Sequence, residues 1–159
     1  MEQPVERGKQ WLEKLLALMA IPATVSTGNE PADSDSCWLT IDETNLTPKQ
    51  LELLIGEQGE SIDAIQYLAN TLLNINLAPE LQSSYTVEIS GYRVKRHQEL
   101  FDLAQKVAQQ VRETGKEVEM TALSAAERRQ IHTFLKDSTD IETESRGQEP
   151  DRRLVVRLR

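Results

Sequence analysis

The chain of 159 residues has few of the residue types on which many catalytic and membrane proteins depend. It has one cysteine, Cys37, so no disulfide can form within the chain, and only two histidines. Its longest apolar run, Leu15–Ile21, is far shorter than the roughly 20 residues that a membrane-spanning helix needs. We therefore expect a soluble protein of the reducing cytoplasm, with no leader and no membrane insertion.

Aromatic residues and the usual ligand patterns are also scarce. Phe, Trp and Tyr make up 4% of the chain, which leaves few rings on which unstacked bases could stack. The sequence contains no HExxH pattern, no EF-hand loop and no P-loop. We expect no cofactor, no metal and no catalytic residues, and hence a protein that is not an enzyme.

Negative charge is in excess, but it is unevenly distributed. The chain has 18 Lys and Arg against 26 Asp and Glu, a net charge of −8. Residues 116–159 contain nine of each sign, so the whole excess lies in residues 1–115. Local patches are therefore a better guide to the partners of this protein than its net charge.

Hydrophobic patterning predicts an α+β fold. Apolar stripes and alternation predict the order helix-strand-strand-helix-helix-strand, then a long helix over 93–113, then strand-helix-strand-strand. A polar loop is expected over residues 28–36, between the first two strands. Capping boxes at 47–50 and 124–127 mark the starts of two helices. Such mixing is typical of α+β domains and differs from the regular alternation of a parallel sheet.

Two glycines frame the segment Ile55-Gly56-Glu57-Gln58-Gly59, between two predicted helices. Such a loop lets the backbone approach a sugar-phosphate chain, and the free N–H groups of the next helix can face phosphate oxygens. A pattern this short is more often a tight turn without a ligand. The carboxylate between the glycines would also repel phosphate and weaken its binding.

Arg128 and His132 lie four residues apart in a predicted helix and so share one face of it. They offer a fixed cation and a flat ring that can stack or form hydrogen bonds. A lone histidine on a helix is more often structural or solvated. The hydroxyls of Thr143 and Ser145 can bind phosphate oxygens or satisfy each other, and Glu149 can pair with an arginine and orient it.

Three stretches of the sequence resemble one bacterial family. Residues 54–70, LIGEQGESIDAIQYLAN, resemble the KH signature of the Jag (KhpB, SpoIIIJ-associated) family of RNA-binding proteins, and residues 91–96, GYRVKR, resemble its strand-to-helix junction. Residues 143–156 follow Arg128 and His132 at the spacing of an R-3-H domain, the module named for its Arg-x-x-x-His. The resemblance covers essentially the whole chain.

This resemblance implies three segments and a set of contact residues. They are a type II KH domain over 1–92 with its GxxG loop at 56–59, a connecting long helix over 93–115, and an R-3-H domain over 116–159 in which a helix packs on a short β-sheet. Expected contacts in the KH domain are Ile55, Gly56, Glu57, Gln58, Gly59, Arg93 and Arg96. Expected contacts in the R-3-H domain are Arg128, His132, Thr143, Ser145, Arg146, Arg152 and Arg153.

The resemblance also implies a function and partners. The expected ligand is single-stranded RNA or single-stranded DNA, and the role is that of a post-transcriptional regulator or RNA chaperone linked to cell-envelope or division control. A second small KH protein, or self-association, is the implied protein contact. The alternative is an adaptor that binds protein through its KH surface, with weak or no RNA binding. The acidic first part would suit a basic protein surface, or it is simply solvated.

Overall fold

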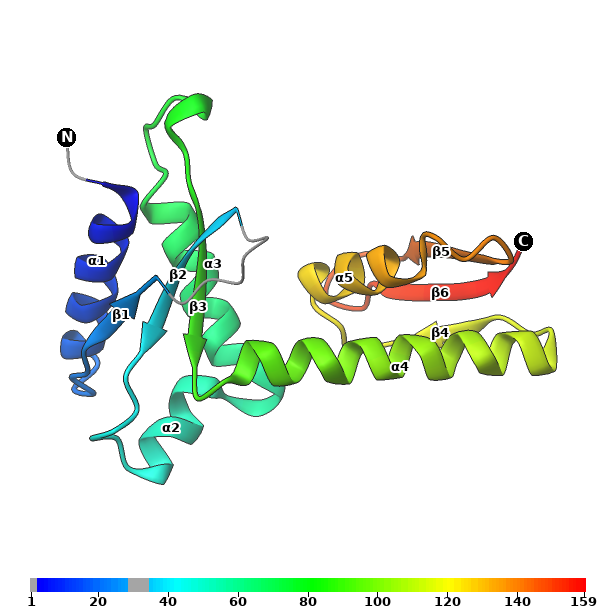
Figure 1. Cartoon of the computed structure of the whole chain (residues 1–159), viewed down its shortest axis with the longest axis horizontal. Coiled ribbons are helices and arrows are strands. Elements are labelled where there is room, and N and C mark those ends of the chain that lie inside the picture. Colours follow the sequence, from blue (N-terminus) through cyan, green and yellow to red (C-terminus); the bar gives the residue numbers. More distant parts are fainter. Residues whose placement is uncertain (1–2, 29–34) are drawn as a thin grey trace. The chain divides into compact units, whose positions relative to one another are not determined.

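The computed structural model of the protein describes residues 3–28 and 35–159, which form two compact units, Met1–Arg93 and Val94–Arg159 (Figure 1). Most of the loop expected over 28–36 lies outside the described residues. The helices and strands follow the predicted order, so the α+β prediction is confirmed. Over the described ranges, none of the helices combines the length and the apolar character needed to cross a bilayer.

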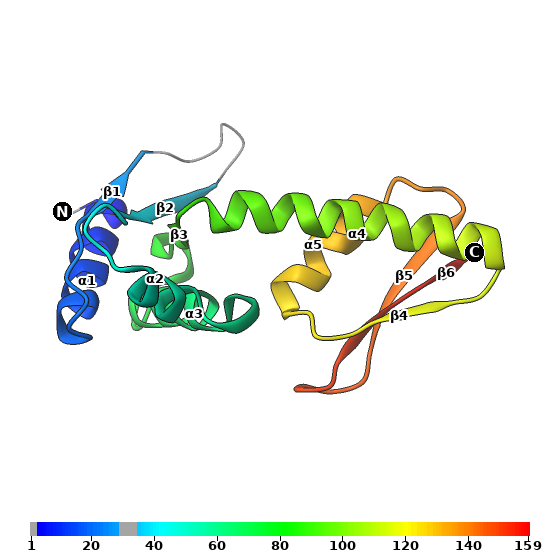
Figure 2. The same cartoon turned by 90° about the horizontal axis from the view of Figure 1, so that it is seen from below.

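In the first unit, three helices lie on one side of a three-stranded sheet (Figure 2). The central strand pairs antiparallel with the first strand and parallel with the third. In spatial order the strands are β1 (Val25–Thr27), β2 (Ser36–Ile41) and β3 (Ser84–Ile89). The helices are α1 (Pro4–Leu18), α2 (Pro48–Ile55) and α3 (Glu60–Leu72), with short 3-10 turns at Glu57–Gly59 and Pro79–Leu81.

The core of the first unit follows from the alternation of its strands. Leu39 and Ile41 of β2 pair with Val87 and Ile89 of β3, and all four side chains are buried. Burying each such side chain contributes about 1.5–3 kcal/mol. The apolar stripes of the helices complete this core with Leu12, Leu16, Leu54, Ile62, Ile65 and Ala69.

Both predicted capping boxes are confirmed. The backbone N–H of Gln50 donates to Thr47 Oγ1 at 3.2 Å, and that of Thr47 donates to the Gln50 side chain at 3.0 Å. Ser124 and Glu127 exchange the same two bonds, both at 3.1 Å. Each box satisfies two N–H groups that a helix start leaves unpaired, which is why α2 and helix α5 (Ala125–Leu135) begin at these residues.

In the second unit, two helices lie on one side of an antiparallel sheet (Figure 2). Helix α4 (Tyr92–Thr114) begins at the end of the first unit and continues through the second, where α5 joins it. The strands, in spatial order, are β4 (Val118–Met120), β6 (Arg153–Leu158) and β5 (Ile141–Arg146).

Helix α4 belongs to the core of the second unit. Its buried residues are Leu100, Ala104, Val107, Ala108 and Val111. They pack in one cluster with residues of α5, of the segment before it and of the sheet, namely Met120, Leu123, Ile131, Leu135, Ile141, Leu154 and Val156. The segment expected as a connector over 93–115 is therefore largely a structural part of the second unit, whose boundary falls after Arg93.

The register of the second sheet assigns alternate residues to opposite faces. Thr143 pairs with Val156 and Ser145 pairs with Leu154, so both hydroxyl residues lie on the face that α4 and α5 cover. The other face carries charged side chains at the intervening positions. These are Glu119, Glu142, Glu144, Arg146, Arg153 and Arg157.

An ion pair joins the end of α4 to the turn before β5. Arg112 Nε donates to Asp140 Oδ2 at 2.7 Å, and Nη2 donates to Oδ1 at 3.0 Å. This hydrogen bonding from Arg112 holds the pKa of the Asp140 carboxyl below its ordinary value. The pair thus makes the stability of the second unit depend on pH in the acid range.

We predict that Arg112→Met raises the pKa of Asp140 toward its ordinary value, because the carboxylate loses its donor. In the wild type the folded pKa lies below the unfolded one. The contribution of the ion pair to stability is therefore present at pH values above the pKa of Asp140 in the unfolded protein. It is lost as the pH falls through the pKa of Asp140 in the folded protein. NMR titration of the Asp140 carboxyl measures the shift. Lys106→Met removes the same charge from α4 as a control, and an unchanged pKa in Arg112→Met would contradict the prediction.

Candidate functional site

A hollow of about 520 Å³ lies between α5 and the strands β5 and β6. It contains five of the seven residues expected from the R-3-H resemblance and leaves out Arg146 and Arg153. Its lining residues are Ala125, Arg128, Arg129, His132, Thr143, Ser145, Glu149, Arg152 and Leu154.

His132 lies on the exposed side of α5, and a strand residue holds its ring in place. Its Nδ1 is 2.5 Å from Thr143 Oγ1. A hydroxyl can both donate and accept, so this contact suits either tautomer of the imidazole. Within the described part of the chain Nε2 has no partner, and it can therefore form a hydrogen bond with a ligand.

Arg128 is buried in the second unit, with only 5% of its surface exposed. Its Nη1 donates to the carbonyl of Leu123 at 2.8 Å and, more weakly, to that of Arg152 at 3.4 Å. Its Nη2 pairs with the carboxylate of Glu149, which confirms the predicted pairing of Glu149 with an arginine. The guanidinium expected to contact nucleic acid is therefore already bound to three internal acceptors.

Arg129 and Arg152 supply the accessible positive charge of the hollow. Both are exposed, and among residues 3–28 and 35–159 neither guanidinium has a hydrogen-bond or ion-pair partner. Of the described residues that line the hollow, Glu149 is the only acid, and its charge is balanced by Arg128. The hollow is thus positive overall and suits a phosphate group.

Arg129 is the residue that sequence reasoning missed. It lies three residues before His132, and residues three apart share a helix face just as residues four apart do. The spacing alone therefore does not distinguish Arg128 from its neighbour. Only the burial of Arg128 and the exposure of Arg129 do so.

Arg146 and Arg153 lie on the opposite face of the sheet, in ion pairs. Arg153 Nη1 is 2.8 Å from a carboxylate oxygen of Glu119. Arg146 is bonded to Glu144 at 3.2 Å and to Glu117 at 3.4 Å, and the hydrogen bond to Glu144 raises the pKa of Arg146. The structure therefore separates these two predicted contacts from the hollow.

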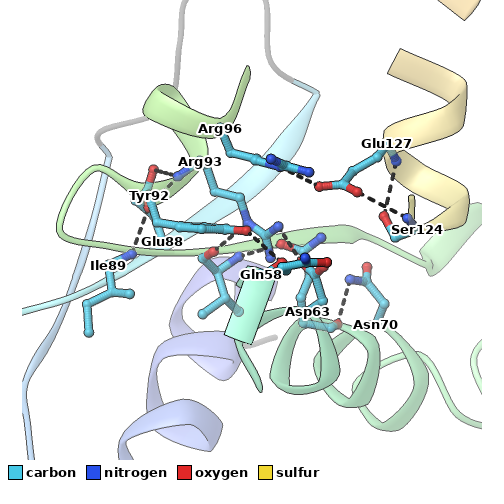
Figure 3. Close-up of polar contacts among 12 residues, drawn as sticks. Gln58, Asp63, Asn70, Glu88, Ile89, Tyr92, Arg93, Arg96, Ser124 and Glu127 are labelled. Atoms are coloured by element: carbon cyan, nitrogen blue, oxygen red, sulfur yellow. Dashed lines mark hydrogen bonds and ion pairs between the residues drawn. The ribbon is translucent and has the colours of Figure 1, made fainter. Parts of the chain in front are cut away.

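In the first unit, the GxxG segment forms the turn between α2 and α3, as predicted. Gly56 and Gly59 have φ values of +75° and +78°, and Gln58 between them has φ +53°. The hydroxyl of Tyr92 donates to the carbonyl of Gln58 at 3.2 Å (Figure 3). The side chains of Glu57 and Gln58 are exposed, so the loop presents a carboxylate to solvent.

Neither arginine expected beside this loop has a free guanidinium. Arg93 Nη1 is 2.5 Å from Asp63 Oδ1, and its Nε donates to the carbonyl of Val87 at 3.1 Å (Figure 3). Arg96 belongs to the second unit, where its Nε donates to Glu127 at 2.7 Å. The structure therefore leaves neither of these two arginines available at the GxxG loop.

The two units differ strongly in charge. The first contains five Lys and Arg against 14 Asp and Glu, a net charge of −9, and the second contains 13 against 12, a net charge of +1. A phosphate chain is repelled by the first surface far more than by the second. Across the described residues, no cluster of His, Cys, Asp or Glu has the arrangement of a metal site.

Comparison with known proteins finds one matching family model and several curated relatives. The family model of the R-3-H domain matches residues 98–158, which include the whole hollow. Over 154 residues the chain is 25% identical to RNA-binding protein KhpB of Clostridium symbiosum, a match that covers 97% of this chain and 66% of that relative. The protein of the same name from Bacillus subtilis is 34% identical over 114 residues, 70% of this chain and 54% of the relative.

A third relative of that name, from Lactiplantibacillus plantarum, is 35% identical over 107 residues, which are 67% of this chain and 33% of the relative. The chain thus spans between about one third and two thirds of the length of these curated relatives. Their names agree with the expectation that the chain is not an enzyme.

We predict that Gly59→Ala destabilises the first unit by about 1–3 kcal/mol, as expected for a side chain forced into left-handed backbone. The added Cβ would also lie 1.9 Å from the Tyr92 hydroxyl oxygen, so the bond to Gln58 would break. Gly91→Ala is the control, because its φ is +69° and its Cβ would meet no atom within 4 Å. Chemical unfolding followed by circular dichroism compares the free energy of unfolding of the two variants. Equal losses of stability in both would contradict a role for the Tyr92 contact.

Proposed function

This chain belongs to the Jag (KhpB) family of bacterial proteins, and on that premise we propose that it binds single-stranded RNA in the hollow of its second unit. The observation that carries the proposal is the presence of two guanidinium groups, those of Arg129 and Arg152, in one hollow with His132, neither of which has a partner among the described residues. Fixed cations beside an exposed ring match the two parts of a nucleotide, its phosphate and its base.

Each lining group has a role in this proposal. The guanidinium groups of Arg129 and Arg152 bind phosphate oxygens, since a planar fork of donors matches the phosphate geometry. The ring of His132 stacks on a base or donates from Nε2, while Thr143 keeps it oriented. The hydroxyl of Ser145 adds a contact to the sugar-phosphate backbone of the RNA. With so few contacts, we expect modest affinity and little sequence preference.

We assign the first unit as a type II KH domain. The order helix-strand-strand-helix-helix-strand and a GxxG turn between α2 and α3 support this assignment. The predicted contacts at residues 55–59 remain part of the proposal, as a weaker secondary surface. Their weakness follows from Glu57 in the loop and from the net charge of −9 on the unit.

The cellular role follows from the same premise. We infer a cytoplasmic post-transcriptional regulator or RNA chaperone, with a link to cell-envelope or division control that rests on the family resemblance. Single-stranded DNA is the competing ligand. Competition between oligouridylate and oligothymidylate of equal length separates the two, because a contact to the 2′-hydroxyl favours RNA.

We predict that Arg129→Ala and Arg152→Ala each weaken RNA binding by about three- to tenfold and flatten the dependence of log affinity on log salt by about 0.7. Each substitution removes one phosphate contact and its counterion release. Fluorescence anisotropy with a labelled oligouridylate, at several salt concentrations, measures both effects. Arg153→Ala is the matched control, because it removes an arginine already paired with Glu119 on the other face of the sheet. An equal loss in the control would place the RNA elsewhere.

A protein-binding role for the first unit is the second candidate function. It is favoured by a stripe of exposed apolar side chains along and just beyond α3, which includes Leu68, Leu72 and Ile75 at 41%, 46% and 60% exposure. Leu68 and Leu72 are four residues apart and so share one face of α3, and Ile75 lies in the turn that follows the helix. The acidic unit suits a basic partner, such as a second small KH protein, better than a second copy of itself.

We predict that the double substitution Leu72→Gln and Ile75→Gln removes a co-purifying protein partner and leaves the affinity for oligouridylate unchanged. Polar side chains abolish the apolar contact without touching the hollow. Affinity purification of the tagged full chain, together with the anisotropy titration, measures both properties. The double variant Arg129→Ala and Arg152→Ala should show the reverse pattern. Loss of RNA affinity in the α3 variant would mean that one surface serves both functions.

A further inference from the structure

Arg128 connects three separate segments around the hollow. From its position on α5, its guanidinium reaches the carbonyl of Leu123 in the segment before that helix. It also reaches the carbonyl of Arg152 just before β6, and the carboxylate of Glu149 in the turn between β5 and β6. One side chain therefore links the helix, the turn and the start of the last strand.

The direction of the Arg152 side chain depends on this connection. Among the residues that the structure describes, the guanidinium of Arg152 has no partner, so only its backbone position directs it toward the hollow. That backbone follows a turn whose own bonds include Asp151 N–H to the Gln148 carbonyl at 2.9 Å. The carbonyl of Arg152 itself is held by Arg128.

Glu149 completes the arrangement by neutralising a buried charge. Arg128 is 5% exposed, and a buried cation without a counter-charge strongly destabilises its surroundings. The side chain of Glu149 is 61% exposed, so little of its own surface is buried and its pairing with Arg128 is what holds it in place. Loss of Glu149 would leave the guanidinium with two carbonyl acceptors and release the turn.

We propose that Arg128 and Glu149 are positioning residues, which hold the backbone of Arg152 so that its guanidinium meets phosphate, and that neither contacts RNA itself. This inference rests on the proposed function of the hollow. It assigns the arginine of the Arg-x-x-x-His pattern to the support of the site, while Arg129 and Arg152 provide the phosphate contacts.

The sign of one effect distinguishes positioning from simple electrostatics. If Glu149 only competed with phosphate for Arg128, its removal would make the hollow more positive and binding tighter. In the positioning role its removal weakens binding, although a negative charge is lost. Glu149→Ala and Glu142→Gln remove the same charge, but Glu142 lies on the far face of the sheet and pairs with Arg157, which also bonds to Glu144.

The test is the anisotropy titration of the full chain with labelled oligouridylate. We expect Glu149→Ala to weaken binding by about three- to tenfold, as for loss of a supporting contact around a binding site. Glu149→Gln keeps one acceptor and should recover part of this loss, while Glu142→Gln should leave the affinity unchanged. Arg128→Lys keeps the charge but cannot bridge three acceptors, so we expect it to lose as much affinity as Glu149→Ala.

Combined substitutions show whether the effect passes through Arg152. In an Arg152→Ala background, Glu149→Ala should cause little further loss, because the group that it positions is absent. In a His132→Ala background its full effect should remain. If Glu149 only stabilised the fold, Glu149→Ala would weaken RNA binding equally in both backgrounds. Thermal unfolding confirms that each variant is folded at the temperature of the titration.

Three results would overturn the inference while leaving the proposed function in place. They are tighter or unchanged binding in Glu149→Ala, full affinity in Arg128→Lys, and an undiminished effect of Glu149→Ala in the Arg152→Ala background. If the wild type and every variant fail to bind at low salt, the proposed function itself fails, and the inference fails with it.

Discussion

The buried guanidinium of Arg128 is the interaction on which the candidate site depends. A cation that is 5% exposed needs acceptors on several sides, and it finds them on the segment before α5, in the β5–β6 turn and just before β6. Satisfying this one charge brings the turn against the helix and leaves a hollow between them. Arg129 and Arg152 carry the charges of the hollow that solvent and ligand can reach, because both residues are exposed.

The pleat of the second sheet determines which of the other arginines can join this site. Thr143 and Ser145 face the helices, while Arg146 and Arg153 fall at positions that face away. On that outer face Arg153 pairs with Glu119 of the neighbouring strand β4, and Arg146 pairs with Glu144 of its own strand, so the pairs leave little net charge. The arginines of this outer face are therefore held in ion pairs away from the candidate site.

The two units divide charge and apolar surface between them. A net charge of −9 and an acidic GxxG loop make the first unit a poor surface for phosphate, and the apolar stripe on α3 suits protein contact instead. The second unit is nearly neutral, and three of its 13 Lys and Arg line one hollow. The net charge of the whole chain thus describes neither surface, because charges act over about a Debye length of 8 Å.

Local patterns in the sequence were sufficient to predict the helices and strands, both capping boxes and the pairing of Glu149 with an arginine. Helix and strand periodicities, caps and turns are properties of a few neighbouring residues, so they can be read without knowing the fold. Tertiary structure alone decided that Arg128 is buried and Arg129 is exposed, since adjacent helix residues point about 100° apart and packing selects which one faces inward. It also decided the pairing of Arg153 with Glu119 and of Arg146 with Glu117, because these glutamates are 34 and 29 residues away in the chain and only the folded sheet brings them close.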